Sequence, residues 1–472
     1  MRGLPISRIA LLSLAPLYVT ACVLFGGASR EGLVVQAGLA AIAALGLTII
    51  FASRALDWLY GPVRTVYFFI GALIVLILMQ LIPLPPGVWS GLADRDVVIS
   101  GYEALGIAAP NLPLSFTPGE TFRSLTQFLP PIFIFTLLSI LPRADGVRLV
   151  KWTIPVLACV SALLGGVQLA TGNQSAFYLY EITNRGFGVG IFSNANHQAT
   201  LMLMGLPFVA LIAASRVRNI SASDADIGLV LMIGIMSLLM VAGVVGAGSM
   251  AGYGMLVPVI LGGAFVYRSH RRRRRRGSSS AGMSISPMMG WAAVAAVVVA
   301  TIGLVLITPQ LDALGLTKAG DGDLSRLGIL ETAKSVLRNH FVLGTGLGGF
   351  DEVFKLYENP DSVTGTFANH AHNDYLQWLI EMGLPGILLL ATFVAWWAKT
   401  ALNIWLSPQQ SDSSTRKAAT IATMVVFLHS FVDYPLRTPA ISVLAAACLA
   451  MMIIPSSPYE NQTQRRSQQI DL

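Results

Sequence analysis

Long apolar runs recur along the whole chain, each about as long as a bilayer is thick. A membrane-crossing helix needs roughly 20 mostly apolar residues. About twelve runs reach that length, which predicts an all-α polytopic membrane protein. The expected spans are residues 9–28, 33–53, 63–84, 124–142, 149–170, 197–215, 227–246, 250–268, 287–308, 374–398, 417–433 and 438–455.

The composition agrees with a membrane protein. Charged residues make up 12% of the 472 residues, about half the roughly 25% that is typical of soluble domains. The net charge of +7 does not indicate nucleic acid, because the basic residues gather in short loops between apolar runs. Cys22, Cys159 and Cys448 lie inside apolar runs, so they form neither a disulfide framework nor a metal spacing.

The N-terminus has two features of an exported protein. Arg2 and Arg8 precede an apolar run, as in a signal peptide, and Val19-Thr20-Ala21-Cys22 resembles a lipoprotein cleavage box. A removable segment is usually followed by a soluble domain, whereas many more apolar runs follow here. We therefore interpret the first run as the first membrane helix.

Basic loops orient the chain, because Lys and Arg accumulate on the cytoplasmic side. The run from Arg271 to Arg276 is the strongest signal, and it predicts cytoplasmic N- and C-termini. Residues 1–472 then form one integral membrane domain. Its expected loops are a basic cytoplasmic one at 269–286 and outer ones at 85–123, 171–196 and 309–373.

Two outer loops are long enough to hold structure of their own. Repeated prolines predict that residues 85–123 are irregular or broken into short helices. In residues 309–373, apolar positions recur at helical spacing. We expect an amphipathic helix over 324–339, lying on the membrane surface or over a cavity. Its expected apolar face consists of Leu324, Leu327, Leu330, Ala333 and Leu337.

Polar and ionisable residues gather at the outer ends of the expected helices. Such groups are costly at a membrane and indicate a functional site. Their common side predicts an active site there, because other residues set the orientation. The candidates are Arg185, Asn196, His197, Arg326, His370, His372, Asn373, Asp374, Gln377, Glu381, His429, Asp433 and Arg437.

Structural alternatives stand beside this hypothesis. Asn373, Gln377 and Glu381 would form one helical stripe, which lines a cavity or packs against other helices. His429 and Asp433, at i and i+4, are either a helix-end pair or supports of the site.

The ligand that these groups would hold is also open. Arg185 and Arg326 would bind a diphosphate through their planar forks, or face lipid headgroups. The glycine-rich run 344–349 is a flexible turn, or a loop whose N–H groups approach phosphate. His370, His372 and Asp374 could ligate a metal, but no partner cysteines support zinc, and a hard cation on the carboxylates is the residual case.

Three motifs in order resemble the O-antigen ligase and polymerase superfamily of bacterial envelopes. Weaker similarity extends over roughly residues 80–440. Many relatives have Ser-Arg at the outer end of a central helix, but here Met250 follows Ser249, so that arginine's role is absent or moved, with Arg185 as the candidate. The motifs are Gly344-x-Gly346-x-Gly348-x-Phe350, His370-x-His372-Asn373-Asp374-Tyr375-Leu376 and Glu381-x-Gly383-x-x-Gly386.

The resemblance implies a glycosyltransferase of the bacterial inner membrane that needs no cofactor or metal. Its donor would be a glycan on undecaprenyl diphosphate, used at the periplasmic face. A ligase passes the glycan to a sugar hydroxyl on lipid A-core. A polymerase of O-antigen, capsule or exopolysaccharide passes it to a second lipid-linked repeat. A transporter or flippase is the alternative from another class, although it would show inverted repeats and broken helices at the midplane.

The candidate residues suit this chemistry. A histidine can take the proton of the acceptor hydroxyl at neutral pH, and we expect His372, with His370 second, to be the base. Arg185 and Arg326 would neutralise the leaving diphosphate. Asn373, Gln377 and Glu381 would orient the base or the sugar. Direct attack would invert the anomeric centre.

Overall fold

The computed structural model describes residues 8–29, 31–53, 59, 61–216, 224–276, 326–358, 360, 368–406 and 413–454. Several sequence predictions fall outside these residues. They are the span at 287–308, the part of the basic loop at 277–286, and residues 309–325, 359 and 361–367 of the largest outer loop.

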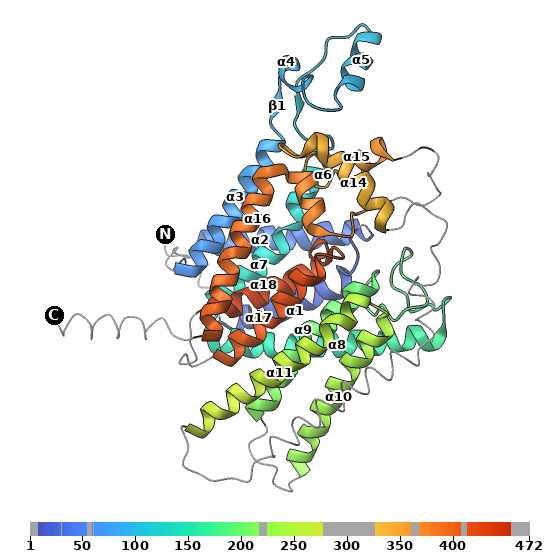
Figure 1. The fold of residues 1–472 in the computed structure, drawn as a ribbon. Helices are drawn as coiled ribbons and strands as arrows, with labels where there is room; N and C mark the ends of the chain where they lie inside the picture. The colour runs from blue at the N-terminus through green and yellow to red at the C-terminus, as the bar shows by residue number, and fades with distance from the viewer. Residues whose placement is uncertain are drawn as a thin grey trace, which may run out of the picture.

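Every expected span within the described residues corresponds to a helix, or at 124–142 to two consecutive helices (Figure 1). Eight are long and apolar enough to cross a membrane, and two further apolar helices, α1 and α18, are shorter. The all-α membrane class is confirmed, while the number twelve stays a prediction. The helices are α1 (Arg8–Phe25), α2 (Leu33–Ser53), α3 (Gly61–Gln80), α6 (Pro118–Gln127), α7 (Leu129–Ile140), α8 (Arg143–Thr171), α9 (Ala195–Arg216), α10 (Asp224–Ala247), α11 (Met250–Arg276), α16 (Asp374–Leu406), α17 (Ser413–His429) and α18 (Pro439–Ile453).

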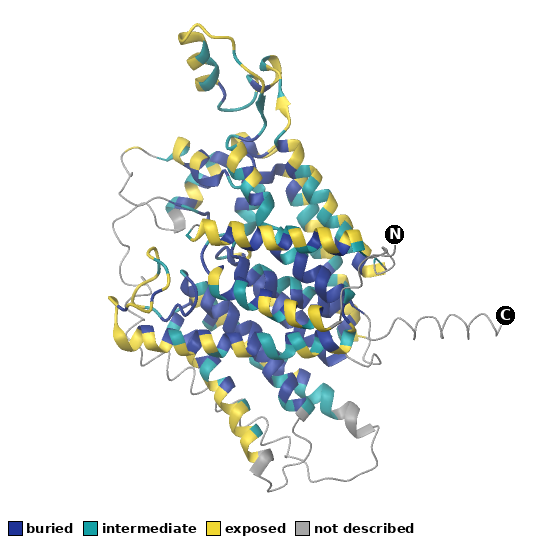
Figure 2. Cartoon of the chain, turned by 180° about the vertical axis from the view of Figure 1, so that it is seen from behind, coloured by how far each residue is buried: buried dark blue, intermediate teal, exposed yellow. Residues whose placement is uncertain are grey.

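Helix α9 forms the centre of the bundle, and 83% of its apolar stretch is buried. It packs against α8, α10, α11 and α17, while α18 packs between α7 and α17. Burial falls to 17% in α3 and 22% in α10, and several large apolar side chains of both helices are exposed. Figure 2 shows that exposed residues lie on the outside of the bundle. Extended apolar surface of this kind fits contact with lipid.

A small layer of short elements caps one end of the bundle. Strands β1 (Pro83–Leu84) and β2 (Leu112–Pro113) pair antiparallel, and α4 (Pro86–Trp89) and α5 (Asp96–Ala104) lie between them. This segment projects from the molecule next to α14 (Arg326–His340) and α15 (Phe350–Tyr357) (Figure 1). Short helices were expected here, but two-residue strands are too short to give a periodic pattern.

The amphipathic helix expected over 324–339 corresponds to α14. Its buried positions are Ile329, Ala333 and Val336, and Leu330 is 36% exposed. The buried stripe is thus rotated from the predicted one, because α15 and α16 pack on the neighbouring face. The opposite face carries an exposed ion pair between Lys334 and Glu331, at 2.7 Å.

Two predicted boundaries are wrong. Residues 269–276 continue α11 instead of forming a loop. Arginine favours helix, and its charge interacts favourably with a helix C-terminus. Helix α17 ends at His429, so Asp433 lies in the connection to the 3₁₀ turn η3 (Pro435–Arg437) and not in the helix. Pro435 disfavours helical backbone at the residue before it.

Candidate functional site

Helix α16 is broken inside its expected span. Gly383 has φ +61°, which separates a short first segment from the longer second one. The break leaves backbone carbonyls of α16 without helical donors, and the glycine-rich run donates to them. Thr345 N donates to Ile380 O and Gly346 N donates to Glu381 O, both at 3.0 Å. Gln80 completes the junction, donating to Glu381 O at 2.9 Å and accepting from the nitrogen of residue 347 at 3.0 Å.

The glycine run therefore packs directly against the backbone of α16 at its break. A Cβ on Gly344 would lie 2.5 Å from Glu381 O. The backbone N–H groups of residues 344–347 all donate to other protein atoms. The hypothesis that these N–H groups approach phosphate is wrong for this stretch, and so is a merely flexible turn.

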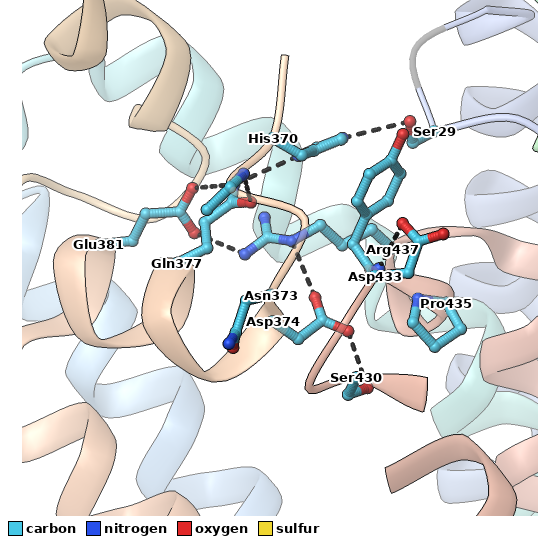
Figure 3. A network of polar contacts seen from close by, with 12 residues as sticks. Ser29, His370, Asn373, Asp374, Gln377, Glu381, Ser430, Asp433, Pro435 and Arg437 are labelled. Atoms are coloured by element: carbon cyan, nitrogen blue, oxygen red, sulfur yellow. Dashed lines mark hydrogen bonds and ion pairs between the residues drawn. The ribbon is translucent and has the colours of Figure 1, made fainter. Parts of the chain in front are cut away.

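A largely buried arginine joins the first segment of α16 to η3. Arg437 donates from Nη2 to Glu381 Oε2 at 3.0 Å and from Nε to Asp374 Oδ1 at 3.2 Å (Figure 3). Ser430 Oγ donates to the other Asp374 oxygen at 2.9 Å. Burial acts to lower the pKa of Arg437, but the two carboxylates raise it above its ordinary value. Buried charges are tolerated when paired in this way.

His370 belongs to the same network. Its Nδ1 lies 3.2 Å from Gln377 Nε2, and its Nε2 lies 3.2 Å from Ser29 Oγ (Figure 3). Gln377 Nε2 also donates to Glu381 Oε1 at 2.8 Å. The predicted i, i+4 pairing of Gln377 with Glu381 is present, and both residues face this buried network.

His372 lies beside a buried carboxylate. Its Nδ1 is 3.5 Å from Asp433 Oδ1, and its side chain is 31% exposed. Asn194 Nδ2 donates to the other Asp433 oxygen at 3.0 Å. Burial alone would raise the pKa of Asp433, but contacts with His372, His197 and Asn196 lower it below its usual value. His372 has φ +48°, a left-handed conformation that is uncommon outside glycine and clusters at functional sites.

The ring of Tyr434 lies among three of the predicted histidines. The ring centroids of His370, His372 and His197 lie 4.1, 5.2 and 5.2 Å from it. Within the part of the chain that the structure describes, neither nitrogen of the buried His197 ring has a hydrogen-bond partner. Buried polar groups are usually paired, so this ring is an exception among the described residues.

Other predicted residues have supporting positions. Asn373 precedes α16, and its Oδ1 accepts from Leu376 N at 3.0 Å. It therefore caps the helix and does not continue the predicted polar stripe. His429 is buried and lies 2.7 Å from Thr200 Oγ1 and 3.4 Å from Ser249 Oγ.

The two arginines predicted to hold diphosphate are not brought together by any described contact. Arg185 donates to Asn173 O at 3.1 Å and lies 5.3 Å from the Tyr178 ring centroid. The Arg326 side chain lies outside the described residues, although the backbone of this residue begins α14. Their phosphate role stays a prediction.

Two adjoining hollows flank the network. A small polar pocket of about 20 Å³ is lined by Ser29, Arg123, Asn369, His370 and Gln377, among others. A larger cavity of about 300 Å³ is almost entirely apolar and runs between α7, α16, α17 and α18. Both hollows are lined by Ser124, Gln127 and Arg437, so they meet at the buried arginine.

Residues 235–391 match the family model described as O-antigen ligase. This match supports the O-antigen ligase superfamily for the chain. Members of this superfamily are glycosyltransferase-like enzymes, and the family together with the apolar helices indicates a membrane protein. No curated protein matches the chain.

The O-antigen ligase segment carries only part of the network. It contains His370, His372, Asp374, Gln377 and Glu381. Their partners Ser29, Asn194, Asp433, Tyr434 and Arg437 come from other parts of the chain. Among the described residues, no group of three or more His, Cys, Asp or Glu is arranged to hold a metal ion.

Sequence reasoning did not pick out several residues of this site, among them Tyr434, Ser29 and Arg123. Tyr434 directly follows the candidate Asp433 in the sequence, with no sign that it packs against the histidines. Ser29 follows α1 in a stretch of small residues, and Arg123 lies in the proline-rich loop. Neither stands in a pattern that a single sequence makes distinctive.

Proposed function

We propose that the protein is an O-antigen ligase-like glycosyltransferase. It takes a glycan from undecaprenyl diphosphate and passes it to a sugar hydroxyl, on lipid A-core or a similar acceptor, at the periplasmic face of the bacterial inner membrane. One observation carries this proposal: an apolar cavity meets a polar pocket, lined in part by His370, at Arg437. A lipid diphosphate has the same division into an apolar tail and a charged head.

The apolar cavity suits an isoprenoid chain. Its volume of about 300 Å³ lies at the lower end of the range for ligand sites. Trp378, Phe393 and Trp397 contribute flat apolar surface, and Asp374 and Ser430 line the cavity next to Arg437. We expect the cavity to hold the part of the tail nearest the diphosphate.

His372 is the proposed general base. Asp433 Oδ1 lies 3.5 Å from its Nδ1, longer than a hydrogen bond; when this contact shortens, the carboxylate would hold the proton on Nδ1 and leave the lone pair of Nε2 to accept the hydroxyl proton. Base and acid contacts are often long before the substrate binds. A well-placed base contributes typically 10²–10⁴-fold to a rate.

The diphosphate needs more positive charge than the described pocket offers. Arg437 already pairs with two carboxylates, and Arg123 pairs with Glu120. Preorganised cations usually supply the largest catalytic effect, so a further cation is required. Arg326 remains our first candidate, with Arg185 second. The polar pocket, at about 20 Å³, holds only one or two waters, so Arg123 must move when the head group enters.

Purified protein in detergent tests the proposal. With a glycan on undecaprenyl diphosphate and a lipid A-core acceptor, wild type should form the transferred product without any gradient across a membrane. His372→Gln should lose this activity, because an amide cannot take the proton, while folding to the same extent. Transfer that requires sealed, energised vesicles would instead indicate a transporter.

The same donor chemistry would serve a polymerase of O-antigen, capsule or exopolysaccharide. Glycan from a deletion strain distinguishes the two. Loss of a ligase leaves long polymer on the undecaprenyl carrier, whereas loss of a polymerase leaves single repeat units.

A further inference from the structure

The amide of Gln377 has only one orientation that satisfies its neighbours. Its Oε1 accepts from the backbone nitrogen of Ala371 at 3.1 Å, and its Nε2 donates to Glu381 Oε1 at 2.8 Å. Rotating the amide by 180° would place its N–H against the N–H of Ala371 and its oxygen against the Glu381 carboxylate. Arg437 holds Glu381 in place from the other oxygen, at 3.0 Å. The amide nitrogen therefore faces His370 Nδ1 (Figure 3).

This orientation determines where His370 carries its proton. A ring nitrogen that faces an N–H donor must accept, so Nδ1 holds the lone pair and Nε2 holds the hydrogen. An imidazolium would place two N–H groups against each other at 3.2 Å. The ring is thus held neutral, with its N–H directed toward Ser29 and the polar pocket.

We infer that His370 is a hydrogen-bond donor to the leaving diphosphate and not a base, and that Gln377 is the positioning residue that fixes this tautomer. The inference rests on the proposed function and divides the work between the two histidines. The Asp433 carboxylate, 3.5 Å from Nδ1 of His372, favours a proton on that nitrogen, so that ring would present a lone pair at Nε2. Gln377 faces Nδ1 of His370, so this ring presents an N–H. The two histidines of the motif thus have opposite roles: His370 donates a hydrogen bond, and His372 accepts a proton.

The step then balances. The acceptor oxygen loses its proton to His372 Nε2 and bonds to the anomeric carbon. The bond from that carbon to the diphosphate oxygen breaks, and its electron pair leaves with the diphosphate. His370 donates its Nε2–H to an oxygen of this leaving group as negative charge develops, without giving up the proton.

Nitrogen NMR tests the tautomer without any substrate. The chain has only six histidines, so ¹⁵N-histidine labelling gives few signals, and the signal missing in His370→Gln belongs to His370. We expect protonated Nε2 and bare Nδ1 in wild type. Gln377→Met removes the donor at similar size and should give a mixture of tautomers. A protonated Nδ1 in wild type would overturn the inference, as would an unchanged tautomer in Gln377→Met.

Transfer assays with matched variants test the role. Glutamine can place its N–H near the position of histidine Nε2, so His370→Gln should retain more activity than His370→Ala by about 10- to 100-fold, the value of a hydrogen bond to a charged group. His372→Gln should be as inactive as His372→Ala. Equal loss in both His370 variants, with an active wild type, would reject the donor role. An inactive wild type would count against the proposed function instead.

Discussion

The backbones of Gly344 and Gly383 touch, and a Cβ built on Gly383 would lie 2.6 Å from the nitrogen of Gly344. Both residues have positive φ, +77° and +61°. Two segments almost forty residues apart thus meet without side chains between them. The contact lies directly beyond Glu381, so it determines where the first segment of α16 ends and where its polar face stands.

Gly383→Ala should destabilise the protein, because a methyl group would push this contact apart and alanine disfavours the left-handed backbone. We expect a loss of about 1–3 kcal/mol, as for other overpacked sites, together with reduced transfer. Thermal unfolding in detergent measures it. Gly71→Ala is the matched control, since its added Cβ would meet nothing within 4 Å. Equal unfolding temperatures for the two variants would show that the close contact between Gly344 and Gly383 is not needed for stability.

Arg437→Gln should disrupt the centre of the network. It would leave Asp374 and Glu381 without their cation, and removing one partner of a buried ion pair costs about 3–5 kcal/mol. We expect a lower unfolding temperature and no transfer. Lys334→Gln breaks an exposed pair with Glu331 and should behave as wild type. A stable, active Arg437→Gln protein would contradict the assigned role.

Asp433→Asn should slow transfer while the protein stays folded. The amide cannot hold the proton on His372 Nδ1 as a carboxylate does, so the base would lose its orientation. We expect a decrease of about 10²–10⁴-fold in kcat, the range for a general base. The exposed carboxylate of Glu352 pairs with Lys355 across one helical turn, and Glu352→Gln serves as the control. Wild-type kcat in Asp433→Asn would remove this carboxylate from the mechanism.

Lowering the pH should remove the contribution of the Asp433 carboxylate to the free energy of unfolding. Its folded-state pKa lies below the unfolded value of about 3.9. The folded protein therefore favours the ionised form. The resulting stabilisation is present above pH ~4 and is lost as the pH falls through the folded pKa. Unfolding temperatures from pH 7 to pH 3 should show wild type approaching Asp433→Asn. A difference that stays constant or widens in acid would contradict the lowered pKa.

Filling the apolar cavity should weaken binding of the lipid donor. Ala446 lines it, and Ala446→Phe would occupy part of its volume. We expect KM for a long-chain donor to rise at least about tenfold, the effect of a mismatched methylene in an apolar pocket. A donor with a short, soluble tail should be less affected. Leu388→Phe, on the exposed side of α16, is the control. Equal KM values for both tail lengths would place the tail elsewhere.

The helices could be predicted because a bilayer imposes a minimum apolar length that a single sequence displays. The positions of polar residues at helix ends were visible for the same reason. The sequence could not show that α9 is central while α3 and α10 face outward, since all three are simply apolar. That difference depends on packing between helices far apart in the chain.

The site was predicted where it forms a local motif and missed where it depends on distant contacts. His370 to Glu381 stand together in the sequence, and the pairing of Gln377 with Glu381 follows from helical spacing. Asn373 looked like part of that stripe, but the helix begins one residue later and makes it a cap. Ser29 meets His370 across more than three hundred residues, and no periodicity encodes such a contact.

Since Ser29 follows α1 and Arg437 follows α17, the polar network around His370 is complete only when segments more than four hundred residues apart have folded together. Until then, His370 would lack its contact with Ser29, and Glu381 would lack its ion pair with Arg437. A chain that ends before Arg437 should therefore lack the proposed glycan transfer. A protein truncated to residues 235–391, the segment that matches the family model, should likewise show no transfer.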